Sequence, residues 1–130
     1  MMYQKALEFI IKKHRGQIRR NGDPYVIHPI RVSQEVTGDY LKTIALLHDV
    51  LEDTDTTMEE LEDVFGQDMA FVVWCITHGK KESYEDYIAR VKINEKTKAV
   101  KIADIVDNLM DNPNEKQIKK YVKALNYLIN

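Results

Sequence analysis

The sequence predicts an all-helical protein, and three observations support that prediction. Apolar residues recur at helical spacing through almost the whole chain. Only three prolines and five glycines interrupt this pattern. No run of alternating apolar and polar residues is long enough to nucleate a β-sheet. The 130 residues give room for one domain with a core of its own, which we expect to cover residues 1–130.

The composition is that of an ordinary globular protein and argues against several classes of function. Hydrophobic residues make up 44% of the chain and charged residues 31%, so disorder is not expected. The formal net charge of −2 comes with no polybasic region, which argues against duplex nucleic acid as a partner. No stretch has the length or pattern of a membrane span or a signal peptide, so no membrane association is expected. The single Cys75 excludes an intrachain disulfide and favours the reducing cytoplasm.

The N-terminal third is expected to form a helix, a loop and a second helix. Apolar residues at helical spacing predict the first helix over about Tyr3–Lys13. The loop follows because Asn-Gly-Asp-Pro at residues 21–24 is a strong turn signal. This loop carries Arg19 and Arg20 near its start. His28 and the proline after it open the second helix, since proline is tolerated in a first helical turn.

The stretch IALLHDVLED, residues 44–53, is expected to form the central helix, because it is apolar around almost its whole circumference. At helical spacing His48 lies one turn before Glu52, and Asp49 one turn before Asp53, so the four share one sector. Burying such groups unpaired would cost on the order of several kcal/mol, which a bound metal ion would offset. The alternative is a hydrogen-bonded core histidine followed by a solvated acidic helix end. We favour a metal, because the helix dipole disfavours acids at a C-terminus.

Five further helices are expected after the central one. Thr57 and Glu60 form a capping-box pattern that begins the first of them. The next, over about residues 68–77, is too apolar to lie at the surface. His78, which follows it, is expected at the surface or at a helix end. We place the five helices at residues 57–65, at about 68–77, from Ser83, from Asn94 and from Asn114.

Two imidazoles and two carboxylates form the candidate metal site. They belong to His28, the adjacent pair His48 and Asp49, and Asp104 in the helix after Asn94. This mixed nitrogen and oxygen set suits Mn²⁺, Fe²⁺, Zn²⁺ or Mg²⁺, and it lacks the thiolates of a structural zinc site. Four protein ligands on a six-coordinate ion leave positions for water and substrate. The pattern therefore indicates catalysis.

Three motifs carry a resemblance to a known family. GQIRRNGDPYVIHPIRV, ALLHDVLEDT and VKIADIVDN follow one another between about His14 and Asn108. In these motifs the chain resembles the HD-domain metal-dependent phosphohydrolases, and most closely the hydrolase domain of RelA/SpoT-type alarmone enzymes. The resemblance implies a single HD-domain bundle of about seven or eight helices. It also implies hydrolysis of a nucleotide, with removal of the 3′-pyrophosphate from (p)ppGpp as the most specific expectation.

The resemblance also implies a role for each matching residue. The metal, implied to be Mn²⁺ although other divalent ions are possible, would be bound by His28, His48, Asp49 and Asp104. The attacking water would be activated and oriented by Glu52 and Asp53. The nucleotide would be contacted by Arg19, Arg20 and Asn108.

Departures from the alarmone enzymes leave other functions open. Ile105 stands where the resemblance implies a basic residue, Asp107 precedes Asn108, and Met110 replaces a usual arginine. The alternatives are a nucleotide or NADPH phosphatase and a non-catalytic nucleotide-binding HD module. The intact Glu52–Asp53 pair argues against the module, because binding alone needs no water activator. The expected partner is thus a phosphorylated small molecule or nucleotide, and the sequence leaves the oligomeric state open.

Overall fold

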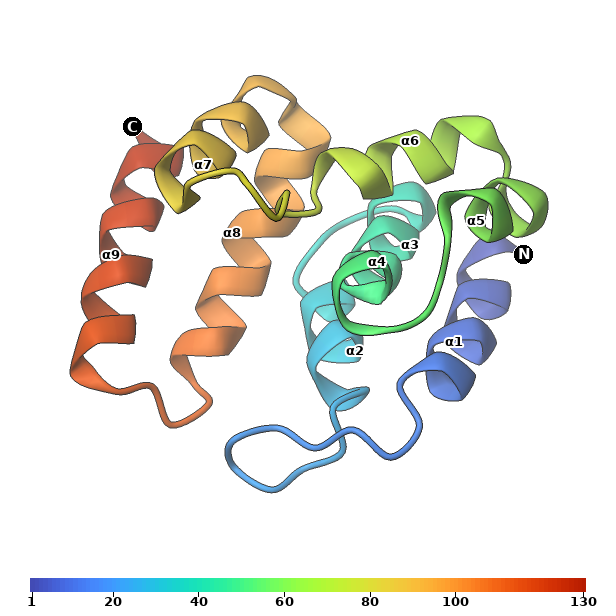
Figure 1. The fold of residues 1–130 in the computed structure, drawn as a ribbon, viewed down its shortest axis with the longest axis horizontal. Helices are drawn as coiled ribbons and strands as arrows, with labels where there is room; N and C mark the ends of the chain where they lie inside the picture. The colour runs from blue at the N-terminus through green and yellow to red at the C-terminus, as the bar shows by residue number, and fades with distance from the viewer.

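Nine helices joined by loops make up the computed structural model, which describes all 130 residues (Figure 1). The helices are α1 (Met2–Lys13), α2 (Ile27–Gln34), α3 (Asp39–Leu47), α4 (Val50–Asp53), α5 (Met58–Phe65), α6 (Gln67–Cys75), α7 (Tyr84–Ile93), α8 (Glu95–Leu109) and α9 (Glu115–Ile129). The only β-type pairing is an isolated bridge between Ile18 and Pro24. The predicted all-helical class is confirmed. None of the nine helices has the length and apolar character needed to cross a bilayer.

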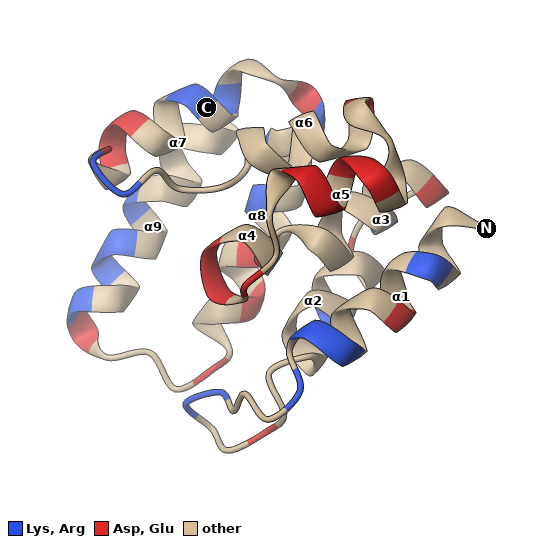
Figure 2. Ribbon diagram, turned by 45° about the vertical axis from the view of Figure 1, so that its right-hand side comes forward, with Lys and Arg blue, Asp and Glu red and all other residues tan.

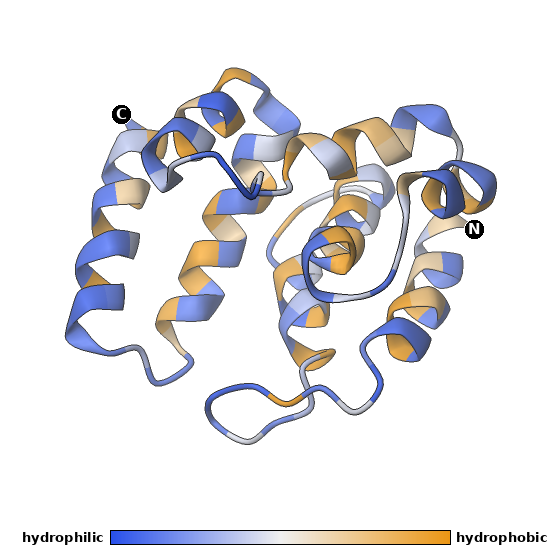
Figure 3. Ribbon diagram, viewed as in Figure 1, coloured by the Kyte–Doolittle hydropathy of each residue, from blue (hydrophilic) through white to orange (hydrophobic).

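The α3 helix lies at the centre of the main core, as the sequence predicted. It packs against α1, α2, α6 and α8. Five consecutive residues, from Thr43 to Leu47, are completely buried, because the helix is surrounded on all sides. In Figure 3 the ribbon of α9 is mostly hydrophilic in colour. A second, smaller core joins α7, α8 and α9.

The prediction of one continuous central helix over residues 44–53 is wrong. The structure divides it into α3 and α4 at His48 and Asp49, and Asp49 has φ −106° and ψ 0°. Adjacent side chains of a regular helix point about 100° apart. The break lets both side chains turn toward one point, since His48 Nε2 lies 3.0 Å from Asp49 Oδ2. When α3 and α4 are taken as one broken helix, the predicted number of about eight holds.

The local start signals agree with the structure. The side chains of Thr57, Ser83 and Asn94 each accept a hydrogen bond from a backbone N–H in the first turn of the helix that follows. Asn114 and Gln117 form a complete capping box at the start of α9. Such caps satisfy N–H groups that have no partner inside the helix, so they fix where each helix begins.

A helix does form close to residues 68–77, but the prediction that it is too apolar to lie at the surface is wrong. Met69, Ala70 and Val73 of α6 are buried, but Phe71 and Trp74 are 59% and 51% exposed. The reason is that α6 packs mainly against α3 and α5, so one of its faces remains at the surface. The two exposed rings stack on each other, with their centroids 6.1 Å apart.

Candidate active site

The four predicted metal ligands converge on one point in the structure. His28 comes from the first turn of α2, His48 and Asp49 from the break after α3, and Asp104 from the middle of α8. One ligand atom from each residue lies within 4.8 Å of the other three. His28, His48 and Asp104 are buried, and Asp49 is nearly so. Packing of α2, α3 and α8 on one another thus brings residues up to 76 positions apart together.

Both imidazoles are held by a partner on the ring nitrogen that faces away from this point. His48 Nδ1 donates to the carbonyl oxygen of Ala45 at 2.6 Å. His28 Nδ1 donates to Asp107 Oδ2 at 2.7 Å. The Nε2 atoms therefore point inward, and they lie 2.8 Å (His28) and 3.1 Å (His48) from Asp104 Oδ1. Outer partners of this kind fix the ring orientation and tautomer of metal-binding histidines.

The two carboxylates are oriented by polar neighbours. Asp104 Oδ2 accepts from Lys101 Nζ at 2.8 Å, which leaves Oδ1 facing the imidazoles. Asn108 Nδ2 donates to the same Oδ1 at 3.2 Å. Asp49 Oδ2 accepts from the hydroxyl of Tyr25, a residue of the loop before α2.

The pKa shifts at this point indicate an environment that favours positive charge. Burial opposes protonation of His28, but Asp104 and Asp107 outweigh it and raise its pKa. Burial likewise opposes protonation of His48, but Asp49 and Asp104 raise its pKa well above 6.5. Burial also opposes ionisation of the acids, yet His48 lowers the pKa of Asp49 to about 2, and Lys101 holds that of Asp104 well below 3.8. Two imidazole nitrogens and two carboxylate oxygens this close together fit a divalent metal ion.

Of the two acids predicted to handle water, Glu52 is the better placed. Its Oε1 accepts from the backbone N–H of His78 at 2.7 Å, which leaves Oε2 unbonded. Partial desolvation raises the pKa of the Glu52 carboxyl, and the nearby Asp49 charge adds to the effect. Desolvation also raises the pKa of Asp53, which accepts from the Tyr25 hydroxyl at 3.3 Å. Only Glu52 lines the cavity described next.

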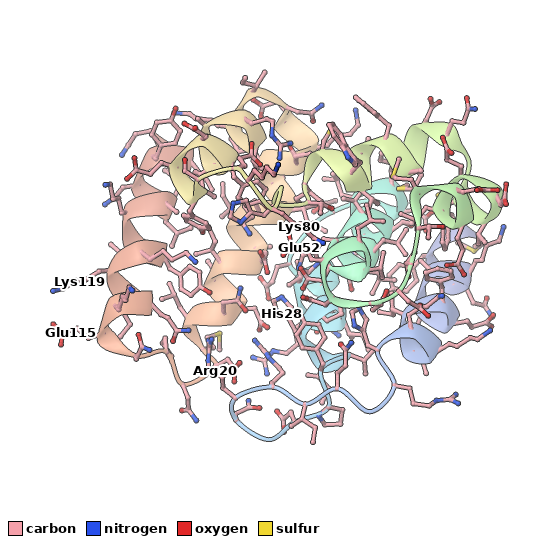
Figure 4. The ribbon with its side chains drawn as sticks, in the orientation of Figure 1. Arg20, His28, Glu52, Lys80, Glu115 and Lys119 are labelled. Atoms are coloured by element: carbon pink, nitrogen blue, oxygen red, sulfur yellow. The ribbon has the colours of Figure 1, made fainter.

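A polar cavity of about 180 Å³ opens over the cluster. Its lining combines acidic and amide residues from the break before α4, from α4 and from α8 with lysines and tyrosines from α7, α8 and α9. Figure 4 shows His28 and Glu52 near the middle of the molecule, with Arg20 farther down on the loop before α2. The acidic residues and the amide of the lining are Asp49, Glu52, Asp104 and Asn108.

Arg19 and Arg20 lie outside the cavity lining and have partners within the protein. Arg19 is 8% exposed, and its guanidinium lies 2.9 Å from Asp107 Oδ2 and 3.2 Å from Asp111 Oδ2. Arg20 Nε donates to the carbonyl oxygen of Asp111 at 2.9 Å. Both arginines therefore attach the loop before α2 to the end of α8. Asn108, the third predicted nucleotide contact, does line the cavity.

Several residues of the site were missed by sequence reasoning. His78, expected at the surface or a helix end, lines the cavity and stacks on Tyr87 with ring centroids 4.7 Å apart. Tyr25 lies inside the motif before His28, so its position was a usable signal. Asp107 lies three residues after Asp104 and thus on a neighbouring part of the helix surface. Lys120, by contrast, belongs to α9 and has no sequence signal that links it to the cluster.

Comparison with known proteins assigns the family. No family model matches the chain. The chain is 38% identical over 118 residues to a guanosine-3′,5′-bis(diphosphate) 3′-pyrophosphohydrolase of Aquifex aeolicus, covering 82% of this chain but only 17% of that protein. It is also 38% identical over 120 residues to the guanosine-3′,5′-bis(diphosphate) 3′-pyrophosphohydrolase MESH1 of Danio rerio, covering 82% of this chain and 67% of MESH1.

The same relationship holds in three dimensions. The chain superposes on the structure of a metazoan ortholog of SpoT that hydrolyzes ppGpp, with a TM-score of 0.81 and 28% sequence identity. The match covers 99% of this chain and 85% of that one. The chain therefore belongs to the family of MESH1 and the SpoT-like guanosine-3′,5′-bis(diphosphate) 3′-pyrophosphohydrolases.

Proposed function

We propose that this protein is a metal-dependent phosphohydrolase that removes the 3′-pyrophosphate from guanosine 3′,5′-bis(diphosphate). The observation that supports this most strongly is the convergence of His28, His48, Asp49 and Asp104 at one point. Asp49 and Asp104 of this cluster line a polar cavity together with Glu52. The proposed substrate is the one for which the two relatives are named. The proposed partner is thus a phosphorylated nucleotide, not duplex nucleic acid or a membrane. The lone Cys75 agrees with a reducing, cytoplasmic compartment.

Mn²⁺ is the metal that we propose for the four ligands. The support is their mixed set of imidazole and carboxylate donors, which suits Mn²⁺, with other divalent ions as competitors. Such an ion, when bound, lowers the pKa of water and neutralises charge on phosphoryl oxygens. The outer partners of the imidazoles, Asp107 and the carbonyl of Ala45, keep both Nε2 atoms directed at it.

Glu52 is the residue that we propose as the general base. The backbone N–H of His78 fixes Oε1, so Oε2 is free to accept a proton from water as the water attacks phosphorus and the bond to the 3′-oxygen breaks. The raised pKa of Glu52 makes the carboxylate a stronger base than an ordinary glutamate. Asp53, held through Tyr25 beside Asp49, is proposed to orient the water.

A substrate panel with Mn²⁺ tests this proposal. The panel contains ppGpp, nucleoside mono-, di- and triphosphates and NADPH, and His48→Ala serves as the metal-site control. We expect release of pyrophosphate from ppGpp by the wild type and none by the variant. Turnover of simple nucleotides or NADPH in place of ppGpp would make the protein a general phosphatase. Tight binding without turnover across the panel would make it a nucleotide-binding module.

A further inference from the structure

The cavity lining carries positive charge that the proposed hydrolysis does not use. Lys101 and Lys120 both line the cavity, together with Tyr84, Tyr87 and Tyr121. Figure 2 shows basic residues along α9 and acidic residues on α4, two helices that both contribute residues to the lining of this cavity. The cavity lining thus carries both carboxylates and ammonium groups, and one of these ammonium groups, that of Lys101, pairs with Asp104.

Lys120 differs from Lys119 and Lys123 on α9 because it has no carboxylate partner. Lys119 pairs with Glu115 and Lys123 with Glu85, each at 3.3 Å. The Lys120 ammonium lies instead over two aromatic rings, 4.1 Å from the centroid of Tyr84 and 5.6 Å from that of Tyr121. Partial desolvation, and then the charge of Lys101, lower the pKa of Lys120. Its positive charge is therefore not neutralised within the protein.

Lys101 adds a second ammonium at the same place. Its Nζ pairs with Asp104 Oδ2 at 2.8 Å and lies 5.0 Å from the centroid of the Tyr87 ring. Asp104 also faces two imidazoles, so it only partly neutralises Lys101.

The hydroxyl of Tyr84 supplies a donor that is not satisfied within the protein. Its oxygen is buried and has no hydrogen-bond partner, a condition shared only with Nε2 of His14 among side-chain atoms. Buried tyrosine hydroxyls usually find a partner, because a buried polar group without one is costly. Tyr84 borders the cavity and lies under the Lys120 ammonium, so donor and cation share one place.

We propose that Lys120, Lys101 and the Tyr84 hydroxyl form a second anion subsite, which binds the phosphate group of the substrate that is not cleaved. This inference rests on the proposed function, since it assumes a nucleotide whose scissile phosphate lies at the histidine and aspartate cluster. Lysine binds phosphate as a compact point charge and a hydrogen-bond donor. The subsite selects substrates that carry phosphate at both the 3′ and the 5′ positions. Residues of α7, α8 and α9 thus bind the uncleaved phosphate, whereas Arg19 and Arg20 hold the loop before α2 in place.

Kinetics of Lys120→Gln on two substrates tests the subsite. One substrate is ppGpp, and the other is guanosine 3′-diphosphate, which lacks the 5′ phosphates. We expect KM for ppGpp to rise about tenfold or more, because one charge-assisted contact is lost, with kcat nearly unchanged. KM for guanosine 3′-diphosphate should stay within about twofold. Lys120→Arg should restore most of the affinity for ppGpp.

Lys119→Gln is the matched control, because Lys119 is a highly exposed lysine on the same helix that pairs with Glu115 (Figure 4). It should leave both KM values unchanged. If Lys120→Gln changes KM equally for the two substrates, or leaves KM for ppGpp unchanged, the proposed subsite is wrong.

A binding measurement separates this inference from the proposed function. Calorimetry with Mn²⁺-loaded wild type should show guanosine 3′,5′-bisphosphate binding at least about tenfold more tightly than guanosine 3′-monophosphate, and Lys120→Gln should remove the difference. If no nucleotide is hydrolysed but this difference appears, the subsite stands and the proposed function fails. If the two nucleotides bind the wild type equally, the subsite is wrong whether or not ppGpp is hydrolysed.

Discussion

Asp107→Asn should weaken both the fold and the metal site, because Asp107 joins the two. The carboxylate is 5% exposed, and its Oδ2 accepts from His28 Nδ1 at 2.7 Å and from Arg19 Nη1 at 2.9 Å. Oδ1 lies 2.9 Å from Arg31 Nε. The amide introduced by the substitution would keep the shape but lose the negative charge and one of the two acceptor oxygens.

The magnitude follows from these contacts. Removing one partner of a buried ion pair typically costs about 3–5 kcal/mol, and here Asp111 still pairs with Arg19 at 3.2 Å, so we expect the low end. Arg31 adds little, since its side chain is 45% exposed and solvent screens the pair. The free energy of unfolding should thus fall by about 3 kcal/mol. Loss of the outer partner of a metal-binding histidine typically lowers metal affinity by about 10- to 100-fold, which we expect for Mn²⁺.

Two measurements and one control check this prediction. Urea unfolding with chelator present gives the stability, and calorimetric titration with Mn²⁺ gives the affinity. Asp111→Asn is the control, because Asp111 is equally buried and pairs with Arg19 but makes no contact with His28. It should lower the stability and leave Mn²⁺ affinity within about twofold. If Asp107→Asn binds Mn²⁺ as tightly as the wild type, Asp107 does not support the metal site.

Three further predictions concern the same site. Glu52→Gln should lower kcat by about 10²- to 10⁴-fold and keep the metal, as steady-state kinetics and metal analysis would show, and unchanged turnover would reassign the base to Asp53. Tyr25→Phe removes the hydroxyl that donates to Asp49, so Mn²⁺ affinity should fall several-fold in calorimetry while the helical circular dichroism stays the same. In the presence of chelator, the raised pKa of His48 contributes to the free energy of unfolding. This contribution is complete below about pH 6.5 and is lost as the pH rises through the pKa of His48 in the folded protein. The Tm of the metal-free protein should therefore fall above pH 6.5 and recover with Mn²⁺, and a Tm that rises instead would contradict the assigned partners of His48.

Local sequence patterns were enough to predict the helical class, most helix starts and the residues of the metal-site cluster. Helical periodicity and caps such as Thr57, Ser83 and Asn94 depend on residues within one or two turns, so they can be seen in the chain itself. The pair His48 and Asp49 stood out because ionisable groups in so apolar a stretch need compensation.

Which charged groups are free to bind a ligand depends instead on how the helices pack. Arg19 looked free in the sequence, yet its carboxylate partner Asp107 lies 88 residues away on α8. Lys120 resembles the other lysines of α9, and only the packing of α7 and α8 beside it shows that it lines the cavity. The break at His48 and Asp49 likewise depends on α2 and α8, which supply the groups toward which both side chains turn. Pairing, burial and helix breaks are set by residues distant in sequence, so local pattern alone did not reveal them.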